Sequence, residues 1–148
     1  MKGKGIKMNK KWILVLGLLS LVSYGSFSYA DTQDEPFDLH LNPSSNNADY
    51  KQTKAREKDT YSYVYAKVNY VKNPKNRVTG YVMGQGWLTS ENVSGGYYYN
   101  FSTKGVKLMV NYVKENKFDK ARIKAGADPK KPNNIEGVWS PDYNKNAF

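Results

Sequence analysis

Residues 60–71 read TYSYVYAKVNYV, a run rich in tyrosine and β-branched residues. These residue types favour extended strands, and the run alternates with the period of two that a half-buried strand shows. The alternation assigns one face to Val64, Ala66, Val68 and Tyr70 and the other to Tyr61, Tyr63, Tyr65, Lys67 and Asn69. We therefore predict a strand whose first face is buried and whose second face is exposed.

Six further segments have the alternation or the tyrosine content of strands: 37–41, 78–88, 97–101, 106–112, 121–125 and 135–139. Pro74 and the asparagines on either side of it predict a turn that pairs 60–71 with 78–88 as a hairpin. Gly80 and Gly84 indicate a bulge or a close backbone approach. Residues 49–59 are too polar to bury much, so we expect a mobile loop there. Short, regularly spaced strands without crossover helices predict an all-β fold, a small antiparallel β-sandwich or barrel of six to seven short strands.

Residues 106–124 leave one alternative open, because their Lys, Glu, Met and Ala content also suits a single helix. Gly105 before the segment, Asn111 inside it and the period of two over 106–112 favour two strands. Together with the other strands, this interpretation predicts the following core residues: Val64, Val68, Val82, Trp87, Leu108, Val110 and Trp139.

The first 30 residues have the pattern of a secretory signal peptide. Five lysines precede the apolar run 12–22, and Ser28-Tyr29-Ala30 fits the small-x-small rule of a cleavage site. A membrane-spanning anchor needs about 20 apolar residues, roughly twice the length of this run. We therefore predict a signal peptide over 1–30, and a secreted single β domain over 31–148 with a loose acidic amino terminus, a polar carboxy-terminal tail and no transmembrane anchor.

Cleavage after Ala30 is directly testable. We expect the exported protein to begin at Asp31, because the small side chains at positions 28 and 30 suit the signal peptidase. Intact-mass measurement of the protein from culture supernatant checks this. Retention of residues 1–30, or a purely cytoplasmic location, would contradict the predicted compartment.

The amino-acid composition excludes several kinds of functional site. The chain has no cysteine and one histidine, which excludes disulfides, thiol nucleophiles and the usual His/Cys zinc sites. Without residues 1–30, 18 basic and 13 acidic residues remain, a net charge of +5, and residues 51–148 alone carry +10. Outside the cell such a domain would meet anionic wall polymers, anionic lipids or extracellular DNA rather than cytoplasmic nucleic acid. An evenly solvated lysine surface is the alternative.

No pattern in the sequence indicates catalysis. His40 lies on the polar face of the 37–41 strand and suits a surface histidine. The carboxylates are not arranged in a recognisable acid–base pair, there is no G-x-S-x-G elbow, and Gly84-Gln85-Gly86 lacks the context of a phosphate loop. We therefore expect a non-enzymatic protein without catalytic residues, metal or cofactor.

Aromatic and basic side chains make the better candidate site. Tyrosine rings beside lysine suit stacking on sugars and contact with anionic polymers, although tyrosine pairs also stabilise sheets on their own. The candidate binding residues, on the strand and around the turn after it, are Tyr61, Tyr63, Tyr65, Lys67, Lys72, Lys75 and Arg77. We expect weak, salt-sensitive adhesion to an anionic cell-wall polymer or cell surface.

Two short motifs carry a resemblance to a known family. Tyr50-Lys51-Gln52-Thr53 and the terminal Gly137-Val138-Trp139-Ser140-Pro141-Asp142 resemble a family of small secreted Gram-positive proteins catalogued as a domain of unknown function. The resemblance implies a β-sheet exoprotein and transfers no activity. The expected function is a secreted exoprotein that interacts with an envelope or extracellular partner. The alternative is a secreted antimicrobial or bacteriocin-like competition protein.

Overall fold

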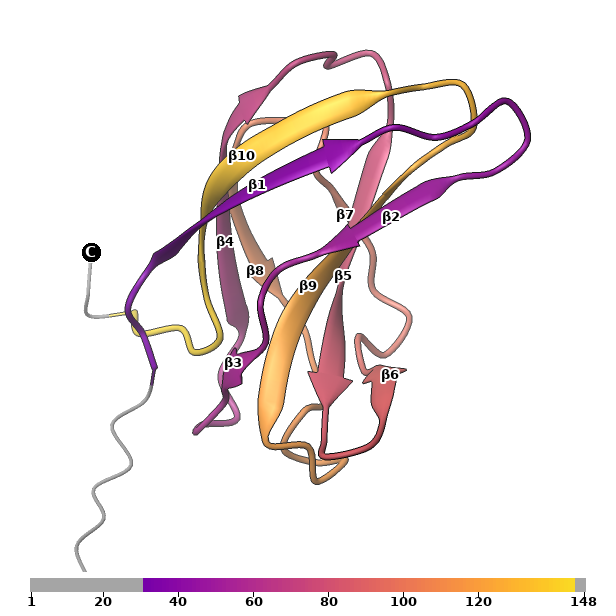
Figure 1. Ribbon diagram of the computed structural model, residues 1–148. Helices are drawn as coiled ribbons and strands as arrows, with labels where there is room; N and C mark the ends of the chain where they lie inside the picture. The colour runs from indigo at the N-terminus through magenta and orange to yellow at the C-terminus, as the bar shows by residue number, and fades with distance from the viewer. Residues whose placement is uncertain (1–30, 146–148) are drawn as a thin grey trace, which may run out of the picture.

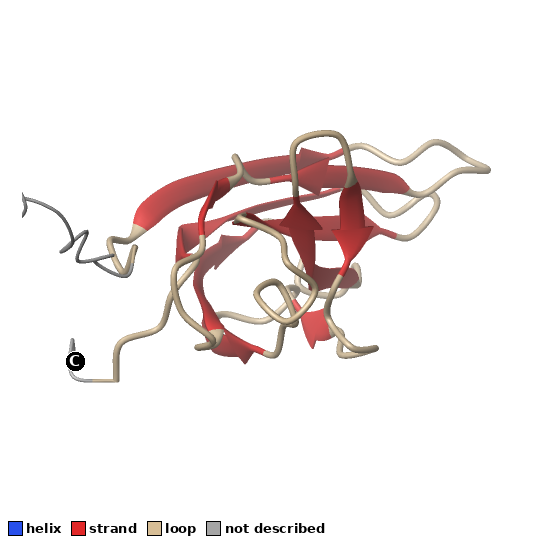
Figure 2. Ribbon diagram, turned by 90° about the horizontal axis from the view of Figure 1, so that it is seen from below, coloured by secondary structure: helices blue, strands red, loops and turns tan. Residues whose placement is uncertain are grey.

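The computed structural model describes residues 31–145, which form ten strands and no helix (Figure 2). The strands are β1 (Glu35–Leu41), β2 (Asp49–Gln52), β3 (Arg56–Glu57), β4 (Val64–Val71), β5 (Val78–Gln85), β6 (Ser90–Asn92), β7 (Tyr99–Asn100), β8 (Gly105–Met109), β9 (Lys120–Ala127) and β10 (Asn133–Ser140). Every pairing is antiparallel, which confirms the predicted fold class, with ten strands where six to seven were expected. Within this part of the chain there is accordingly no helix long and apolar enough to cross a bilayer. The predicted signal peptide lies outside the described residues.

Two sheets enclose the core (Figure 1). The first sheet has the order β1-β10-β4-β8, and the second has the order β2-β9-β5-β6, with β3 joined to β9 and β7 joined to β5. Val64, Val68, Val82 and Trp139 are at most 1% exposed, so these four predicted core residues are confirmed. The alternation was sufficient here because each of these strands has one face on the core.

The predicted hairpin between residues 60–71 and 78–88 is wrong. β4 pairs with β10 and β8, whereas β5 pairs with β9, β6 and β7, so residues 72–77 cross from one sheet to the other. The side chain of Asn133 holds this crossing, since its amide donates to the carbonyl oxygens of Asn73 and Asn76 at 3.0 Å. At Gly80 the close neighbour is the ring of Phe101, which occupies the space a side chain would need, rather than the backbone that the sequence predicted.

A bulge changes the phase of β4 near its end. Tyr70 lies opposite Glu136 and Val68 opposite Gly137, which leaves Asn69 as the extra residue. Val71 is therefore buried, and Tyr70, which the alternation placed on the buried face, is 42% exposed.

The interpretation of residues 106–124 is correct in type and wrong in phase. The segment contains β8 and the start of β9 rather than a helix. Its inward residue is Met109, which is fully buried opposite Val64, whereas Leu108 is 36% exposed and Val110 is only partly buried. Leu108 and Val110 are thus not core residues, because β8 presents its odd-numbered positions to the interior.

Residues 49–59 are not the predicted mobile loop. They form β2 and β3, and Thr53, Arg56 and Lys58 are all buried. Arg56 donates to the carbonyl oxygen of Trp139 at 3.0 Å and to the carboxylate of Asp31, in the segment predicted to be loose. Polar side chains can be buried here because each has a built-in partner.

Trp87 is the largest departure from the predicted core. It lies in the turn between β5 and β6 and is 94% exposed. The turn has no alternation of apolar and polar residues that could indicate whether Trp87 is buried. The core prediction for Trp87 therefore rested on its residue type alone, and it is wrong.

Candidate binding surfaces

The structure separates the seven residues predicted to bind. Tyr61 and Tyr63 precede β4, Lys67 lies on its outer face, and Lys72, Lys75 and Arg77 follow its other end. The eight residues of β4 span roughly 26 Å, so these groups do not form one site.

Tyr65 is not an exposed binding residue, as its face of β4 had suggested. It is 3% exposed, and its ring stacks on that of Tyr143 with centroids 6.3 Å apart. Burial raises the pKa of its hydroxyl. The carboxy-terminal segment covers this part of the outer face, which the alternation within β4 does not reveal.

Tyr61 and Tyr63 do come together with two other tyrosines, Tyr112 and Tyr143. The four residues line an open groove of about 740 Å³ with Thr60, Ser62 and Asn111. Val110 lines the same groove, which accounts for its partial burial. Lys145 also lines the groove, so rings and hydroxyls lie beside a cation, an arrangement that suits a neutral or anionic ligand with sugar or ring surface.

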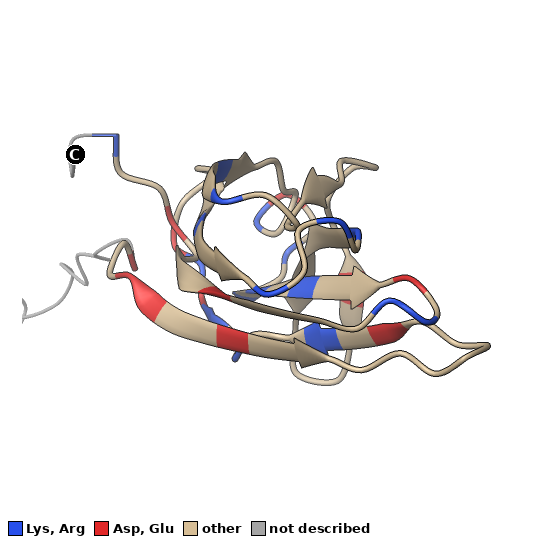
Figure 3. Ribbon diagram, turned by 90° about the horizontal axis from the view of Figure 1, so that it is seen from above, with Lys and Arg blue, Asp and Glu red and all other residues tan. Residues whose placement is uncertain are grey.

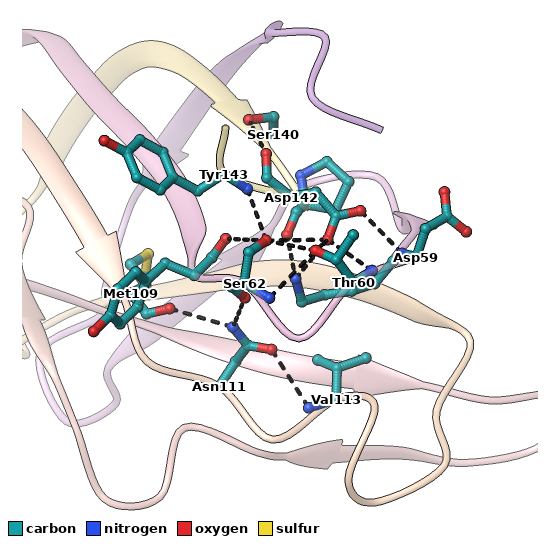
Figure 4. A network of polar contacts seen from close by, with 12 residues as sticks. Asp59, Thr60, Ser62, Met109, Asn111, Val113, Ser140, Asp142 and Tyr143 are labelled. Atoms are coloured by element: carbon teal, nitrogen blue, oxygen red, sulfur yellow. Dashed lines mark hydrogen bonds and ion pairs between the residues drawn. The ribbon is translucent and has the colours of Figure 1, made fainter. Parts of the chain in front are cut away.

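A buried ion pair between Lys58 and Asp142 holds one wall of this groove. Figure 4 shows Asp142 together with Asp59, Thr60 and Ser62. The Lys58 Nζ donates to Asp142 Oδ1 at 2.8 Å and to the Pro141 carbonyl oxygen at 2.9 Å, and both charged side chains are fully buried. Asp142 also accepts hydrogen bonds from the backbone N–H groups of Asp59 and Thr60 and from the Thr60 hydroxyl. The loop that carries Tyr61 and Tyr63 is thereby fixed to the segment after β10.

Both charges of the pair have shifted pKa values. Burial alone would raise the pKa of Asp142, but the hydrogen bonds from Lys58, Thr60 and Asp59 bring it below its ordinary value. Burial lowers the pKa of Lys58, against the hydrogen bond and charge of Asp142, which raise it.

A second surface lies on the outer face of the second sheet. Lys120, Arg122 and Lys124 occupy alternate positions of β9 and so point to one side; we call them the β9 cation row. The register places Tyr81 of β5 opposite Lys124 and Gln85 opposite Lys120. Basic and acidic positions are otherwise interspersed along the ribbon (Figure 3).

Neutral groups hold two members of the row. Arg122 donates to Gln52 Oε1 at 3.1 Å and to Gln85, and the Lys124 Nζ lies 5.1 Å from the centre of the Tyr50 ring. Lys120 is different, because it forms an ion pair with Glu57 at 3.1 Å. Among residues 31–145, no carboxylate lies within 4.0 Å of Arg122 or Lys124, so these two charges are uncompensated.

Tyrosine rings flank the row. The ring of Tyr50 lies over Gly126, where a side chain would collide with it, and Tyr81 meets Tyr98 edge to face at 5.3 Å. These rings and Arg77 line a depression of about 640 Å³. Arg77 is therefore the only one of the seven predicted residues that lines this depression, where it forms an ion pair with Asp128 at 3.6 Å.

The sequence indicates some of the residues of this surface and not others. Arg122 and Lys124 alternate with apolar residues in the predicted strand 121–125, which places both on its polar face. The sequence does not indicate Tyr50 and Gln52, because the polar segment 49–59 predicts a loop and carries no sign of its pairing with β9.

The chain matches a known sequence family. A sequence-family model described as "Protein of unknown function (DUF2712)" matches residues 25–143. The chain belongs to the DUF2712 family. The match includes all ten strands and both motifs, so the predicted membership of an unknown-function family is confirmed. No curated protein matches the chain.

The two motifs of this DUF2712 chain have different places in the fold. Tyr50-Lys51-Gln52-Thr53 overlaps β2 and contributes Tyr50 and Gln52 to the outer face of the second sheet. Gly137-Val138-Trp139-Ser140-Pro141-Asp142 contributes Trp139 to the core and Asp142 to the buried ion pair. In the DUF2712 fold seen here, one motif thus supplies surface groups and the other supplies internal ones.

Proposed function

We propose that the protein is a secreted, non-enzymatic exoprotein that adheres to an anionic envelope polymer through the outer face of β2, β9 and β5. The observation that carries the proposal is the pair of uncompensated charges, Arg122 and Lys124, beside exposed tyrosine rings. The groups on this face are guanidinium, ammonium, amide and phenol, which bind anions and sugars.

The chemistry of the face suits an extended polyanion. Residues 120 to 124 span about 13 Å of strand, enough for successive anionic groups of one chain to meet successive cations. A guanidinium presents a planar fork to phosphate or carboxylate, and glutamine side chains already hold that of Arg122 in place. Tyr50 and Tyr98, both more than half exposed, offer ring surface to the sugar or polyol between the anions.

The double substitution Arg122→Gln and Lys124→Gln tests this function. We expect retention on purified Gram-positive cell walls at low salt to fall about tenfold, because two of the anion-binding groups are lost. A co-sedimentation assay measures it, on walls before and after extraction of their anionic polymer. Binding of the parent should fall on extracted walls and at high salt.

Lys72→Gln with Lys75→Gln is the matched control, since it removes the same charge from the segment 72–77, before the start of β5. This variant should bind within about twofold of the parent, less than 0.5 kcal/mol. Equal losses in both variants would mean that overall charge is responsible. Loss only in the control would return the site to the turn after β4.

One observation favours the alternative of a competition protein that acts on a target cell surface. The turn between β5 and β6 presents Trp87 and Leu88 to solvent, 94% and 86% exposed. Inhibition of neighbouring strains by the purified protein distinguishes this function from harmless adhesion.

A further inference from the structure

The turn between β5 and β6 is an apolar tip. Gln85 pairs with Ser90, and the Gly86 N–H donates to the Thr89 carbonyl oxygen at 2.9 Å, so Trp87 and Leu88 are the two central residues. The turn lies at the lower end of the molecule in Figure 1. No other large apolar side chains of residues 31–145 are as exposed as these two. Transfer of these two side chains from water into an apolar environment would therefore be favourable.

The hairpin that carries the tip is braced. The ring of Phe118 packs against Gly84, where a side chain would collide with it, and is itself only 8% exposed. The Val93 N–H donates to Val82 at 3.1 Å, and the Tyr112 N–H donates to Val93 at 2.8 Å. Trp87 and Leu88 are therefore presented on a fixed support.

Cations lie directly behind the tip. Trp87 borders a depression of about 530 Å³ that is also lined by Lys54, Lys120 and Arg122, against Glu57 and Asp119. Lys120 is paired with Glu57. The Nε of Arg122 is buried without a hydrogen-bond partner among the described residues. The depression thus has an excess of positive charge and an unsatisfied donor at its edge.

We propose that Trp87 and Leu88 insert into the interface of an anionic phospholipid bilayer, with Lys54 and Arg122 receiving the lipid phosphates. Tryptophan favours the headgroup level, leucine the acyl boundary, and basic side chains are drawn to anionic lipid. A protein partner would need about 800 Å² from this side, far more than two side chains at a convex tip provide. The inference goes beyond adhesion to a polymer and does not depend on it.

Vesicle binding by the full exported chain tests the proposal. We expect sedimentation with vesicles of phosphatidylglycerol and phosphatidylcholine in equal parts, and little with phosphatidylcholine alone. Trp87→Ser with Leu88→Ser should weaken binding to the anionic vesicles at least tenfold, because the inserted apolar surface is lost. Tyr61→Ser with Tyr63→Ser, which removes two exposed rings elsewhere, is the matched control and should bind as the parent does.

The same variants separate this inference from the proposed function. Trp87→Ser with Leu88→Ser should retain wall binding, because the β9 cation row is unchanged. Arg122→Gln with Lys124→Gln removes a residue that both proposals use, so it should weaken binding to walls and to anionic vesicles. Absence of parent binding to the anionic vesicles, or equal binding by the tip variant, would overturn the membrane contact.

Fluorescence provides a measurement on the unmodified protein, should the tip variant fold poorly. Trp139 is buried, so an emission change on adding vesicles reports Trp87 in the chain that begins at Asp31. Brominated lipid in anionic vesicles should quench this emission. Unquenched emission from vesicle-bound protein would exclude insertion of the tip.

Discussion

Asp142→Ala should destabilise the folded protein by about 3–5 kcal/mol, a large share of the 5–15 kcal/mol that a domain usually has. The substitution leaves the Lys58 ammonium buried with only the Pro141 carbonyl oxygen, 2.9 Å away, as a partner. It also removes the acceptor of the Asp59 and Thr60 backbone N–H groups. Urea denaturation of parent and variant measures the loss.

Asp128→Ala is the matched control, because it removes a carboxylate from an exposed pair with Arg77, 3.6 Å apart. Its cost should stay below about 1 kcal/mol. Replacing both Lys58 and Asp142 by apolar residues should recover part of the loss, since no buried charge is then left alone. Equal costs for Asp142→Ala and Asp128→Ala would show that the buried pair has no special role.

The pH dependence of unfolding gives a second measurement of the same pair. The pKa of Asp142 is lower in the folded protein than its ordinary value of 3.8. As the pH falls, Asp142 is therefore protonated in the unfolded chain before it is protonated in the folded protein. Its contribution to the free energy of unfolding is fully present above the unfolded pKa and is lost as the pH falls through the folded pKa. The parent should lose stability on acidification below about pH 4, and Asp142→Ala should lose less.

Most of the strands that could be predicted have one face on the core; β7, with two residues and neither of them buried, was found through its tyrosine content. Each of the seven predicted segments contains or overlaps a strand. Burial of one face of a strand produces the alternation of apolar and polar residues on which the prediction rests. The three strands that were missed are short or lack a buried face: β2 and β6 have no buried residue and β3 has two residues. Such strands bury little apolar surface, so burial leaves little alternation in their sequences.

The candidate sites were harder to predict than the strands because they combine segments. Tyr65 shares a face with Tyr63 in the sequence, yet the segment after β10 covers only Tyr65. Arg122 was visible on a polar face, but Gln52, which holds it, comes from a strand 70 residues earlier. Register between distant strands determines both outcomes, and neither strand encodes it alone.

The strand β8 shows how alternation can be correct in period and wrong in phase. Its odd-numbered residues lie opposite the inward residues of β4: Gly105 opposite Val68, Lys107 opposite Ala66 and Met109 opposite Val64. Lys107 tolerates this side of an edge strand because its Nζ reaches the Thr103 carbonyl oxygen at 3.1 Å. Partial burial lowers the pKa of Lys107. The apolar Val106 and Leu108 therefore face outward, against the simplest interpretation of the pattern.

Met109→Ala should accordingly cost about 2–5 kcal/mol, the range for removing a fully buried methionine, because the side chain fills the core opposite Val64. Leu108→Ala removes a side chain of similar size from the outer face and should cost about 1 kcal/mol or less. Urea denaturation midpoints of the two variants, compared at equal slopes, measure the difference. If β8 had the phase that its apolar residues suggest, the order would reverse, and Leu108→Ala would be the more destabilising change. A larger loss at Met109 fixes the orientation of the strand by experiment, and with it the side of the sheet on which Val110 and the tyrosine groove lie.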